Sequence, residues 1–244
     1  MNISKDYKMR IVIPSLNRKE KLTNCINSIK KARFGHNINL YLYFSDNSEL
    51  LYFSKLTKDD NWIHCKIVKD YRVPSFWNAR VKEMGEDVDG LMYLNDDVTL
   101  FSDTIGKAIK YMTTLYPNTD GIIGMNQVNI PVNQALKTAF GVIGRKFGDR
   151  FPDRQILCPE YFRFYSDKEL YLYATKVNKF TFCHLVQLEH HHPAFNIKLA
   201  DSTHLKVRKY LSKDREIFSE RQMKTLLWGV NFYLASEFDL KGDK

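Results

Sequence analysis

Short apolar runs alternate with helix-periodic stretches through the first half of the chain. Apolar residues dominate 9–14, 40–46, 64–68, 90–95 and 121–125, and we predict that these segments are strands. Between them, apolar side chains recur at helical spacing and predict helices over 22–32, 76–84 and from about 103 to 116. Strands alternating with helices favour an α/β fold, in which helices cover both faces of a mostly parallel sheet.

Polar and proline residues mark the expected ends of these elements. Pro14 is expected to stop the first strand, and Asn17 to cap the helix that follows it. Ser75 is expected to cap the helix over 76–84.

The pattern changes beyond about residue 126. Gly141, Gly144 and Gly148 punctuate a stretch that reads as loops. A helix over 167–177, a strand over 180–193 and a charged helical tail from about residue 201 are predicted to follow.

Composition indicates a globular protein. Hydrophobic residues make up 44% of the 244 residues and aromatic residues 14%, which is enough apolar material for a core. No apolar run is long enough to predict a transmembrane helix, and the first ten residues contain no apolar segment typical of a secretory signal. The four cysteines lie far apart, so we expect reduced thiols and a cytoplasmic protein.

The chain is basic, with 37 Lys and Arg against 28 Asp and Glu. A net charge of +9 suits a polyanionic partner such as nucleic acid, although solubility alone would also explain it. Six basic residues fall in the tail: Lys206, Arg208, Lys209, Lys213, Arg215 and Arg221. The tail could pack over a site, bind a polyanion or present a solvated helix face, and no aromatic residues alternate with its charges as a base-stacking surface requires.

Two adjacent carboxylates, Asp96 and Asp97, follow Asn95 at the end of the apolar run 90–95. The polar loops 14–18 and 45–48 follow two other predicted strands, so all three loops should meet at one edge of the sheet, where α/β proteins bind ligands. Adjacent carboxylates repel each other, and Mg²⁺ or Mn²⁺ held by one or two carboxylates and phosphate oxygens would relieve that repulsion. The alternative is a solvated turn that caps the helix starting near Asp103.

Six segments, in order, resemble the family 2 glycosyltransferases, which are nucleotide-sugar enzymes with the GT-A fold. They are "IVIPSLNRKEKLTNCINSI", "YFSDNSE", "VPSFWNARVKEM", "YLNDDVTLF", "FRFYSDKELYLYA" and "LVQLEHHHP", and together they span roughly residues 9–195. The fourth is similar to the metal-binding "DxD" region, although Asn95 replaces its first Asp. The second is similar to the nucleobase motif, with the usual diaspartate reduced to Ser45-Asp46.

The resemblance implies a GT-A-like, Rossmann-type catalytic domain over residues 1–200. Its nucleotide-sugar half would end near 125 and its acceptor half would cover 126–200, with a basic helical extension over 201–244. The implied activity is a metal-dependent transfer of a hexose or pentose from a nucleotide-sugar, a UDP-sugar in the first instance, to an acceptor hydroxyl. Inversion at the anomeric carbon is implied by the family alone. The acceptor would be a glycan or a hydroxyl-bearing base in DNA, and the oligomeric state is left open.

The resemblance also implies the site residues. Asp97 would hold Mn²⁺ or Mg²⁺ with His190 or His192, and Asp167, with Glu169 in reserve, would be the general base. Contacts to the donor would come from Pro14, Asn17, Arg18, Asp46, Arg72, Asn95 and Asp96.

Each assignment has a structural alternative. Asp46 could form an Asx turn with the two residues after it, and Arg72 could be a surface charge. Asp167 and Glu169, at the start of a helix, could serve as a cap or as partners of the helix dipole. Asn78 and Arg80 are expected to hold loops rather than contact the donor.

The three histidines 190–192 cannot all serve one site, because neighbours in a strand point to opposite faces. His190 and His192 share one face, and His191 points away. His184 falls on the face of His190 by the same count, but is expected to be structural. The run could also simply be packed or partly exposed. Zinc is disfavoured because no cysteine lies at ligand spacing.

Two other classes of protein remain open. A nucleotidyltransferase would use a similar sheet and carboxylate-bound Mg²⁺, but it normally has a glycine-rich loop, and "PSLNRKEK" contains no glycine. A non-catalytic nucleic-acid-binding protein would explain the charge but not the acidic edge.

Overall fold

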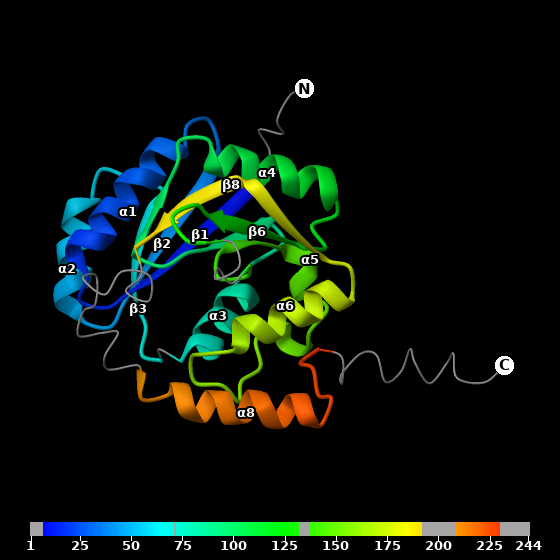
Figure 1. Cartoon of the computed structure of the whole chain (residues 1–244). Helices are drawn as coiled ribbons and strands as arrows, with labels where there is room; N and C mark the ends of the chain where they lie inside the picture. The colour runs from blue at the N-terminus through cyan, green and yellow to red at the C-terminus, as the bar shows by residue number, and fades with distance from the viewer. Residues whose placement is uncertain (1–6, 71, 132–136, 192–207, 230–244) are drawn as a thin grey trace.

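The computed structural model describes residues 7–70, 72–131, 137–191 and 208–229. In this part of the chain, strands form one sheet in the order β3-β2-β1-β4-β7-β6-β8-β5 (Figure 1). The strands are β1 Lys8–Ser15, β2 Asn37–Phe44, β3 Ile63–Ile67, β4 Gly90–Tyr93, β5 Val98–Leu100, β6 Ile122–Gln127, β7 Gly141–Gly144 and β8 Phe180–His190. The helices are α1 Lys19–Ala32, α2 Asn47–Leu56, α3 Val73–Lys82, α4 Thr104–Leu115, α5 Arg145–Gly148, α6 Ser166–Lys176 and α8 Leu211–Met223, with a 3-10 turn η1 at Pro152–Arg154.

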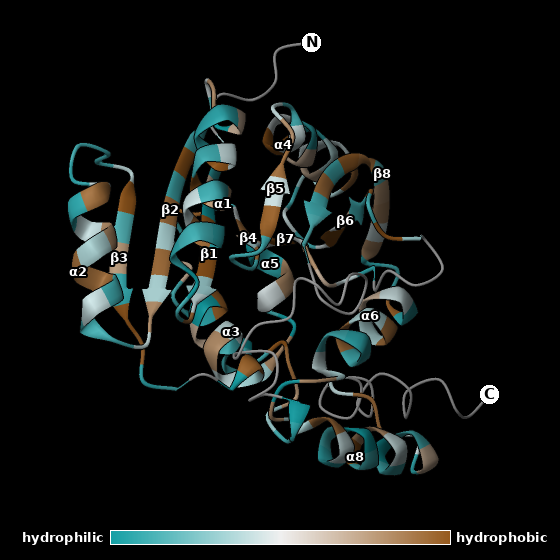
Figure 2. Cartoon of the chain, turned by 60° about the vertical axis from the view of Figure 1, so that its left-hand side comes forward, coloured by the Kyte–Doolittle hydropathy of each residue, from teal (hydrophilic) through white to brown (hydrophobic). Residues whose placement is uncertain are grey.

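The sheet is buried on both faces by two separate apolar clusters. Along β1, Met9, Ile11 and Ile13 point into a cluster with α1, α2 and α4, whereas Val12 points into a second cluster with α3, α5 and α6. This alternation is what a strand covered on both faces requires. Figure 1 shows α1 and α4 on one side of the sheet and α3, α5 and α6 on the other, and Figure 2 shows apolar strands inside mixed helices.

The predicted α/β architecture is confirmed, with two strands, β5 and β7, that were not predicted. Four of the seven strand pairings are parallel, but β7 lies between β4 and β6 and is antiparallel to both. This segment was predicted to be a loop, because four residues bounded by glycines give no periodic signal. Both glycines are needed: a Cβ on Gly141 would clash with the Ile123 carbonyl oxygen, and one on Gly144 would clash with the Thr119 carbonyl oxygen.

Several predicted ends are wrong for local reasons. Pro14 lies inside β1, at a point where β4 no longer pairs with that strand, so its missing N–H breaks no bond on that side. Asn17 is not the cap of α1: it has a left-handed φ of 55°, and Arg18 is the N-cap. Ser75 is not the cap of α3, which begins at Val73 with Pro74 in its first turn.

A β-bulge changes the face of His184. The pairing of β6 with β8 shifts register between Met125 and Asn126, so that Met125 pairs with Cys183 and Asn126 with Gln187. The count of alternating faces is broken there, and His184 is exposed whereas His190 is buried. The prediction that these two histidines share a face is therefore wrong.

Candidate functional site

The carboxyl ends of β1 and β4 meet the end of β8, and charged side chains collect there. Ser15 ends β1, Asp96 and Asp97 follow β4, and His190 ends β8 beside Val98 of β5. We call Ser15, Arg18, Asp96, Asp97 and His190 the carboxylate rim.

Asp96 is buried and satisfied within the rim. Its two carboxylate oxygens accept one hydrogen bond each, from Ser15 Oγ at 2.9 Å and from Arg18 Nη1 at 2.9 Å. Burial raises the pKa of Asp96 to about 6, Arg18 opposes that rise, and neighbouring Asp97 adds to it. The adjacent carboxylates thus share one guanidinium, because Arg18 Nη1 also lies 3.4 Å from Asp97 Oδ2.

Asp97 faces His190 across the rim. Asp97 Oδ1 lies 3.5 Å from His190 Nε2, and both side chains are almost fully buried. The other ring nitrogen, Nδ1, lies 2.7 Å from Gln127 Oε1. With the Gln127 amide in this orientation, its Oε1 accepts a hydrogen bond from Nδ1, and Nε2 faces the Asp97 carboxylate. An imidazole nitrogen and a carboxylate oxygen that face each other at this distance can share a proton or a cation.

The backbone of His190 is also fixed. Asn129 Oδ1 accepts from the His190 N–H at 2.9 Å, and Asn129 Nδ2 donates to the His190 carbonyl at 3.0 Å. The edge of the His190 ring packs at 87° to Phe140. His191 points elsewhere, with Nε2 3.0 Å from Thr99 Oγ1, and His192 lies outside the described residues. His190 is the histidine that the described chain brings to the rim.

Glu49 fixes the loop that follows β1, a role that sequence reasoning missed. Glu49 is buried at the start of α2 and accepts hydrogen bonds from the backbone N–H groups of Asn17 and Arg18, at 2.9 and 3.2 Å. The loop after β1 is therefore fixed by its backbone, which leaves the Arg18 side chain to reach the rim. An acid in the first turn of a helix carries no local signal of such a role.

Asp46 and Arg72 occupy exposed positions. Asp46 is the N-cap of α2: its Oδ1 accepts from Ser48 N, Ser48 Oγ and Glu49 N, and the bond from the Ser48 hydroxyl contributes most to a lowered pKa. Arg72 precedes α3 and pairs with Asp70, with both side chains about half exposed. The structural alternatives for both residues are therefore present, and neither contact rules out a substrate on the exposed side.

A cavity of about 370 Å³ opens beside the rim. Asn95 and Tyr93, at the end of β4, form one wall with Trp77 of α3, and the segment 163–170 forms another. Leu211 of α8 also lines it. The lining is largely aromatic and aliphatic, with a few polar groups, which is typical of a small-molecule site.

The two predicted general bases differ in what they contact. Asp167 lines the cavity, and burial raises its pKa to about 6. Glu169, two residues further along α6, is 1% exposed. Its carboxylate accepts from Arg221 at 2.8 Å, from the Tyr161 hydroxyl at 2.7 Å and from the Trp228 backbone at 2.7 Å. Glu169 is therefore held by hydrogen bonds and an ion pair, and Asp167 is the acid that faces the cavity.

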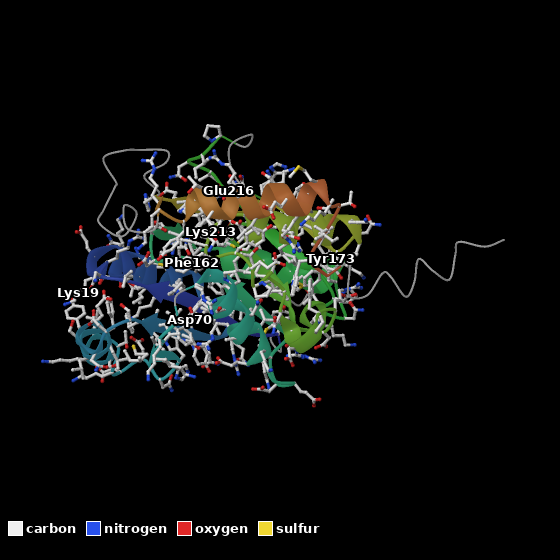
Figure 3. The ribbon with its side chains drawn as sticks, turned by 90° about the horizontal axis from the view of Figure 1, so that it is seen from below. Lys19, Asp70, Phe162, Tyr173, Lys213 and Glu216 are labelled. Atoms are coloured by element: carbon white, nitrogen blue, oxygen red, sulfur yellow. The ribbon has the colours of Figure 1, made fainter. Side chains whose placement is uncertain are left out.

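The tail helix α8 braces the loop ahead of Asp167. Asp214, which is completely buried, accepts hydrogen bonds from the backbone N–H groups of Phe162, Arg163 and Phe164, at 2.7 to 2.9 Å. Phe162 stacks on Tyr210 with ring centroids 3.5 Å apart. In Figure 3, α8 with Lys213 and Glu216 lies against the segment that carries Phe162.

Contacts with α8 also hold the start of α6. Tyr165, its N-cap, has a left-handed φ of 67° and stacks on Phe218 of α8. Backbone strain of this kind persists only where surrounding contacts impose it. The tail was expected to be solvated, to pack over a site or to bind a polyanion, and the described part of it packs against the site's loop. Its predicted boundary at residue 200, Asp201 and Lys206 lie outside the described residues.

Asn78 and Arg80 hold structure, as predicted. Asn78 exchanges two hydrogen bonds of 2.8 Å with the backbone of Leu157, on the cavity wall. Arg80 donates to Glu83 and lies 4.3 Å from the Tyr43 ring centroid. In the described ranges, no helix is both long and apolar enough to span a membrane.

No protein-family model matches the sequence, and no curated protein matches it. Solved structures do match the fold. The mannosyltransferase PcManGT from Pyrobaculum calidifontis, in complex with GDP-Man and Mn²⁺, has a TM-score of 0.58 at 10% identity, over 76% of this chain and 58% of that one. S. aureus TarS 1–349 has a TM-score of 0.53 at 12% identity, over 79% and 63%.

A second structure of TarS 1–349, in complex with UDP, has a TM-score of 0.50 at 13% identity, over 72% of this chain and 57% of that one. The chain thus spans less than two thirds of the length of each of these structures. The predicted fold is confirmed: this chain has the GT-A-like α/β fold that these structures share.

Proposed function

We propose that the chain is a metal-dependent glycosyltransferase that moves a sugar from a nucleotide-sugar to an acceptor hydroxyl. The observation that carries the proposal is the Asp97–His190 pair, 3.5 Å apart, beside a cavity that Asp167 lines. The fold likeness adds to it, since one similar structure holds GDP-Man with Mn²⁺ and another holds UDP. A nucleotidyltransferase would normally have a glycine-rich loop after β1, which "PSLNRKEK" lacks, and a nucleic-acid-binding protein does not account for the acidic rim.

The rim fits Mn²⁺ or Mg²⁺. Asp97 and His190 would hold the ion, because a carboxylate oxygen and an imidazole lone pair already converge there. Among described residues no group of three or more protein ligands gathers, so the remaining ligands would be substrate oxygens and water. When bound, the metal would supply charge neutralisation for the departing diphosphate. Ser15 and Arg18 would keep the two carboxylates of the rim in place.

Asp167 would act as the general base on the acceptor hydroxyl. A carboxyl with a pKa of about 6 is largely ionised at neutral pH and still basic enough to accept a proton during attack. Thr138 Oγ1 donates to the Asp167 backbone carbonyl at 2.8 Å and fixes the residue against the cavity wall. A single displacement with this base inverts the anomeric centre.

The donor would lie along the edge formed by the loops after β1, β2 and β4. Asp46 Oδ1 is used by the cap of α2, which leaves Oδ2 to accept a hydrogen bond from a nucleobase. Pro14, Asn17, Arg18, Asn95 and Asp96 border the diphosphate, and Arg72 would reach it from the start of α3. The first expectation is a UDP-sugar, and the acceptor is proposed to be a glycan or a hydroxyl-bearing DNA base.

A thermal-shift panel of UDP-, GDP-, CDP-, ADP- and dTDP-sugars, with and without Mn²⁺, tests the proposal. We expect one nucleotide to stabilise the protein only with metal, by about 2.7 kcal/mol at a hundredfold excess over its dissociation constant. Stabilisation by duplex DNA or RNA, with none by any nucleotide-sugar, would favour a polyanion-binding protein instead. Metal-dependent stabilisation by a nucleoside triphosphate alone would favour a nucleotidyltransferase.

A further inference from the structure

Arg163 is a cation of the cavity that the proposed chemistry does not use. It lies four residues before Asp167, in the loop that α8 braces, and its side chain lines the cavity. No carboxylate among the described residues lies within 4.0 Å of its guanidinium, whereas Arg18 is paired with both Asp96 and Asp97. Half-buried arginines normally have such a partner, because removing a guanidinium from water without one is costly.

Arg163 lies near charged groups of both the carboxylate rim and α6. Asp96 and Asp97 on one side and Asp167 on the other are close enough to interact with it electrostatically. Burial, and then the charge of Arg18, lowers the pKa of Arg163, but a guanidinium remains protonated at neutral pH. An Mn²⁺ ion at the rim would add further positive charge. The cavity then has a surplus of cations that a substrate anion would balance.

The backbone of Arg163 is held independently of its side chain. Asp214 accepts the Arg163 N–H at 2.8 Å and the neighbouring N–H groups of Phe162 and Phe164. The guanidinium is therefore presented to the cavity from a fixed loop while its five N–H donors remain available. A planar donor fork matches two oxygens of a phosphate group, and preorganisation of this kind reduces the entropy lost on binding.

We propose that Arg163 binds a phosphate group of a substrate in this cavity. The proposal rests on the proposed function for what the cavity contains. Two sources supply the same chemistry: the diphosphate of the nucleotide-sugar, or a phosphate carried by the acceptor near its reacting hydroxyl. In either case Arg163 is a binding residue that touches substrate, and Asp214 is the residue that positions it.

Titration calorimetry on the full chain separates the sources. Mn²⁺ with UDP, and Mn²⁺ with GDP, are titrated into wild type, Arg163→Gln, Arg163→Lys and Arg10→Gln. Arg10 is the matched control, since it lies at the opposite end of β1 and donates to the Glu83 carbonyl. Inorganic phosphate is then titrated into each protein already saturated with Mn²⁺ and the nucleotide.

If the phosphate is the donor's, Arg163→Gln weakens nucleoside diphosphate binding by about tenfold or more, as expected for a lost bond between charged groups. If it is the acceptor's, nucleotide binding is unchanged and Arg163→Gln weakens binding of inorganic phosphate by a similar factor. Arg163→Lys keeps the charge without the fork, so it should lose less in either case, and it serves as the test if the Gln variant does not fold.

Unchanged affinities for both ligands in both Arg163 variants would overturn the proposal, as would an equal loss in Arg10→Gln. Failure of the proposed function looks different. In that case wild type binds no nucleoside diphosphate with Mn²⁺, and the comparison of wild type with Arg163→Gln for inorganic phosphate alone still decides the role of Arg163.

Discussion

The carboxylate rim lies beside the cavity and the loop over residues 162–167 contributes to its wall, and the two are held in different ways. In the rim, charged side chains hold one another: Arg18 bridges Asp96 and Asp97, and Asp97 faces His190. In the loop, the carboxylate of Asp214, from α8, holds the backbone, and the side chains of Arg163 and Asp167 face the cavity.

Under the proposed function, this difference separates binding from chemistry. Groups that neutralise one another at the rim would be preorganised for a cation and a diphosphate. Groups whose backbone is fixed elsewhere keep their own side chains available for the reacting part of the substrate. Substitution of Asp167 should therefore spare metal and nucleotide binding, and variants of the rim should not.

The largest effect is expected at Asp167. Asp167→Asn keeps the shape of the side chain and removes the base, so the rate of transfer should fall by about 10²–10⁴-fold. Binding of Mn²⁺ and nucleoside diphosphate should remain within about twofold of wild type if the two regions act separately. A parallel loss of nucleotide binding would break the comparison.

The pH dependence sharpens the assignment of Asp167. At saturating Mn²⁺, kcat/KM of the wild type should rise as the pH increases through about 6 and then level off, because only the ionised carboxyl accepts a proton. Because folding raises this pKa, ionising Asp167 lowers the free energy of unfolding. The loss accumulates as the pH rises from about 4 to about 6 and is complete above that range. Asp167→Asn should therefore melt at a higher temperature than wild type above pH 6. A flat rate profile, or an unchanged melting temperature, would argue against a buried base.

The next largest effect is expected at Asp97. Asp97→Asn removes the charge that faces His190, and we expect loss of metal-dependent nucleotide binding and about a 10²–10³-fold lower rate. Asp60→Asn is the control, since Asp60 precedes β3 at the opposite edge of the sheet and pairs with Lys30 in the described structure. Undiminished Mn²⁺-dependent binding in Asp97→Asn would contradict the metal assignment.

A smaller effect is expected when Asp214, which holds the loop from α8, is substituted. Asp214→Asn leaves one acceptor oxygen for three N–H groups, which should lower the free energy of unfolding by about 1–3 kcal/mol. The rate should fall, because the disturbed loop carries Asp167, and nucleotide binding should fall with it only if Arg163 binds the donor diphosphate. Lys213→Ala, at the exposed neighbouring position, should change neither quantity. Equal behaviour of the two variants would mean that α8 does not position the loop.

The smallest effect is expected at Asp46. Asp46→Asn can still cap α2 through one oxygen, so stability should change by less than about 0.5 kcal/mol. Exchanging Oδ2 for an amide converts an acceptor into a donor, and the preference among nucleotides should change more than the affinity. An unaltered preference across the panel would remove Asp46 from the nucleobase site.

The position of the rim could be predicted from sequence because its two acids follow a strand and its histidine ends one. The apolar run ahead of Asn95 and the strand leading to His190 place those residues at the carboxyl edge of the sheet. The roles of Glu49, Gln127 and Asp214 could not be predicted. Each acts on a residue far along the chain, 50 to 52 positions away for Asp214, and no periodic pattern records such a pairing.

The loop and β7 show the same limit. Arg163 is one basic residue among 37 in the chain, and only the folded structure distinguishes it, by placing it in a cavity wall with no carboxylate of the described residues within 4.0 Å of its guanidinium. The four residues of β7 join the sheet because their glycines allow close backbone approach, which depends on the neighbouring strands.

The most direct test of the account is pulsed electron paramagnetic resonance of Mn²⁺ bound with a nucleoside diphosphate. Wild type and His191→Gln should show nitrogen coupling from one imidazole, and His190→Gln should show none, because His190 Nε2 faces Asp97 whereas His191 contacts Thr99. Nitrogen coupling that persists in His190→Gln, or bound Mn²⁺ without nitrogen coupling in wild type, would contradict a metal held by Asp97 and His190.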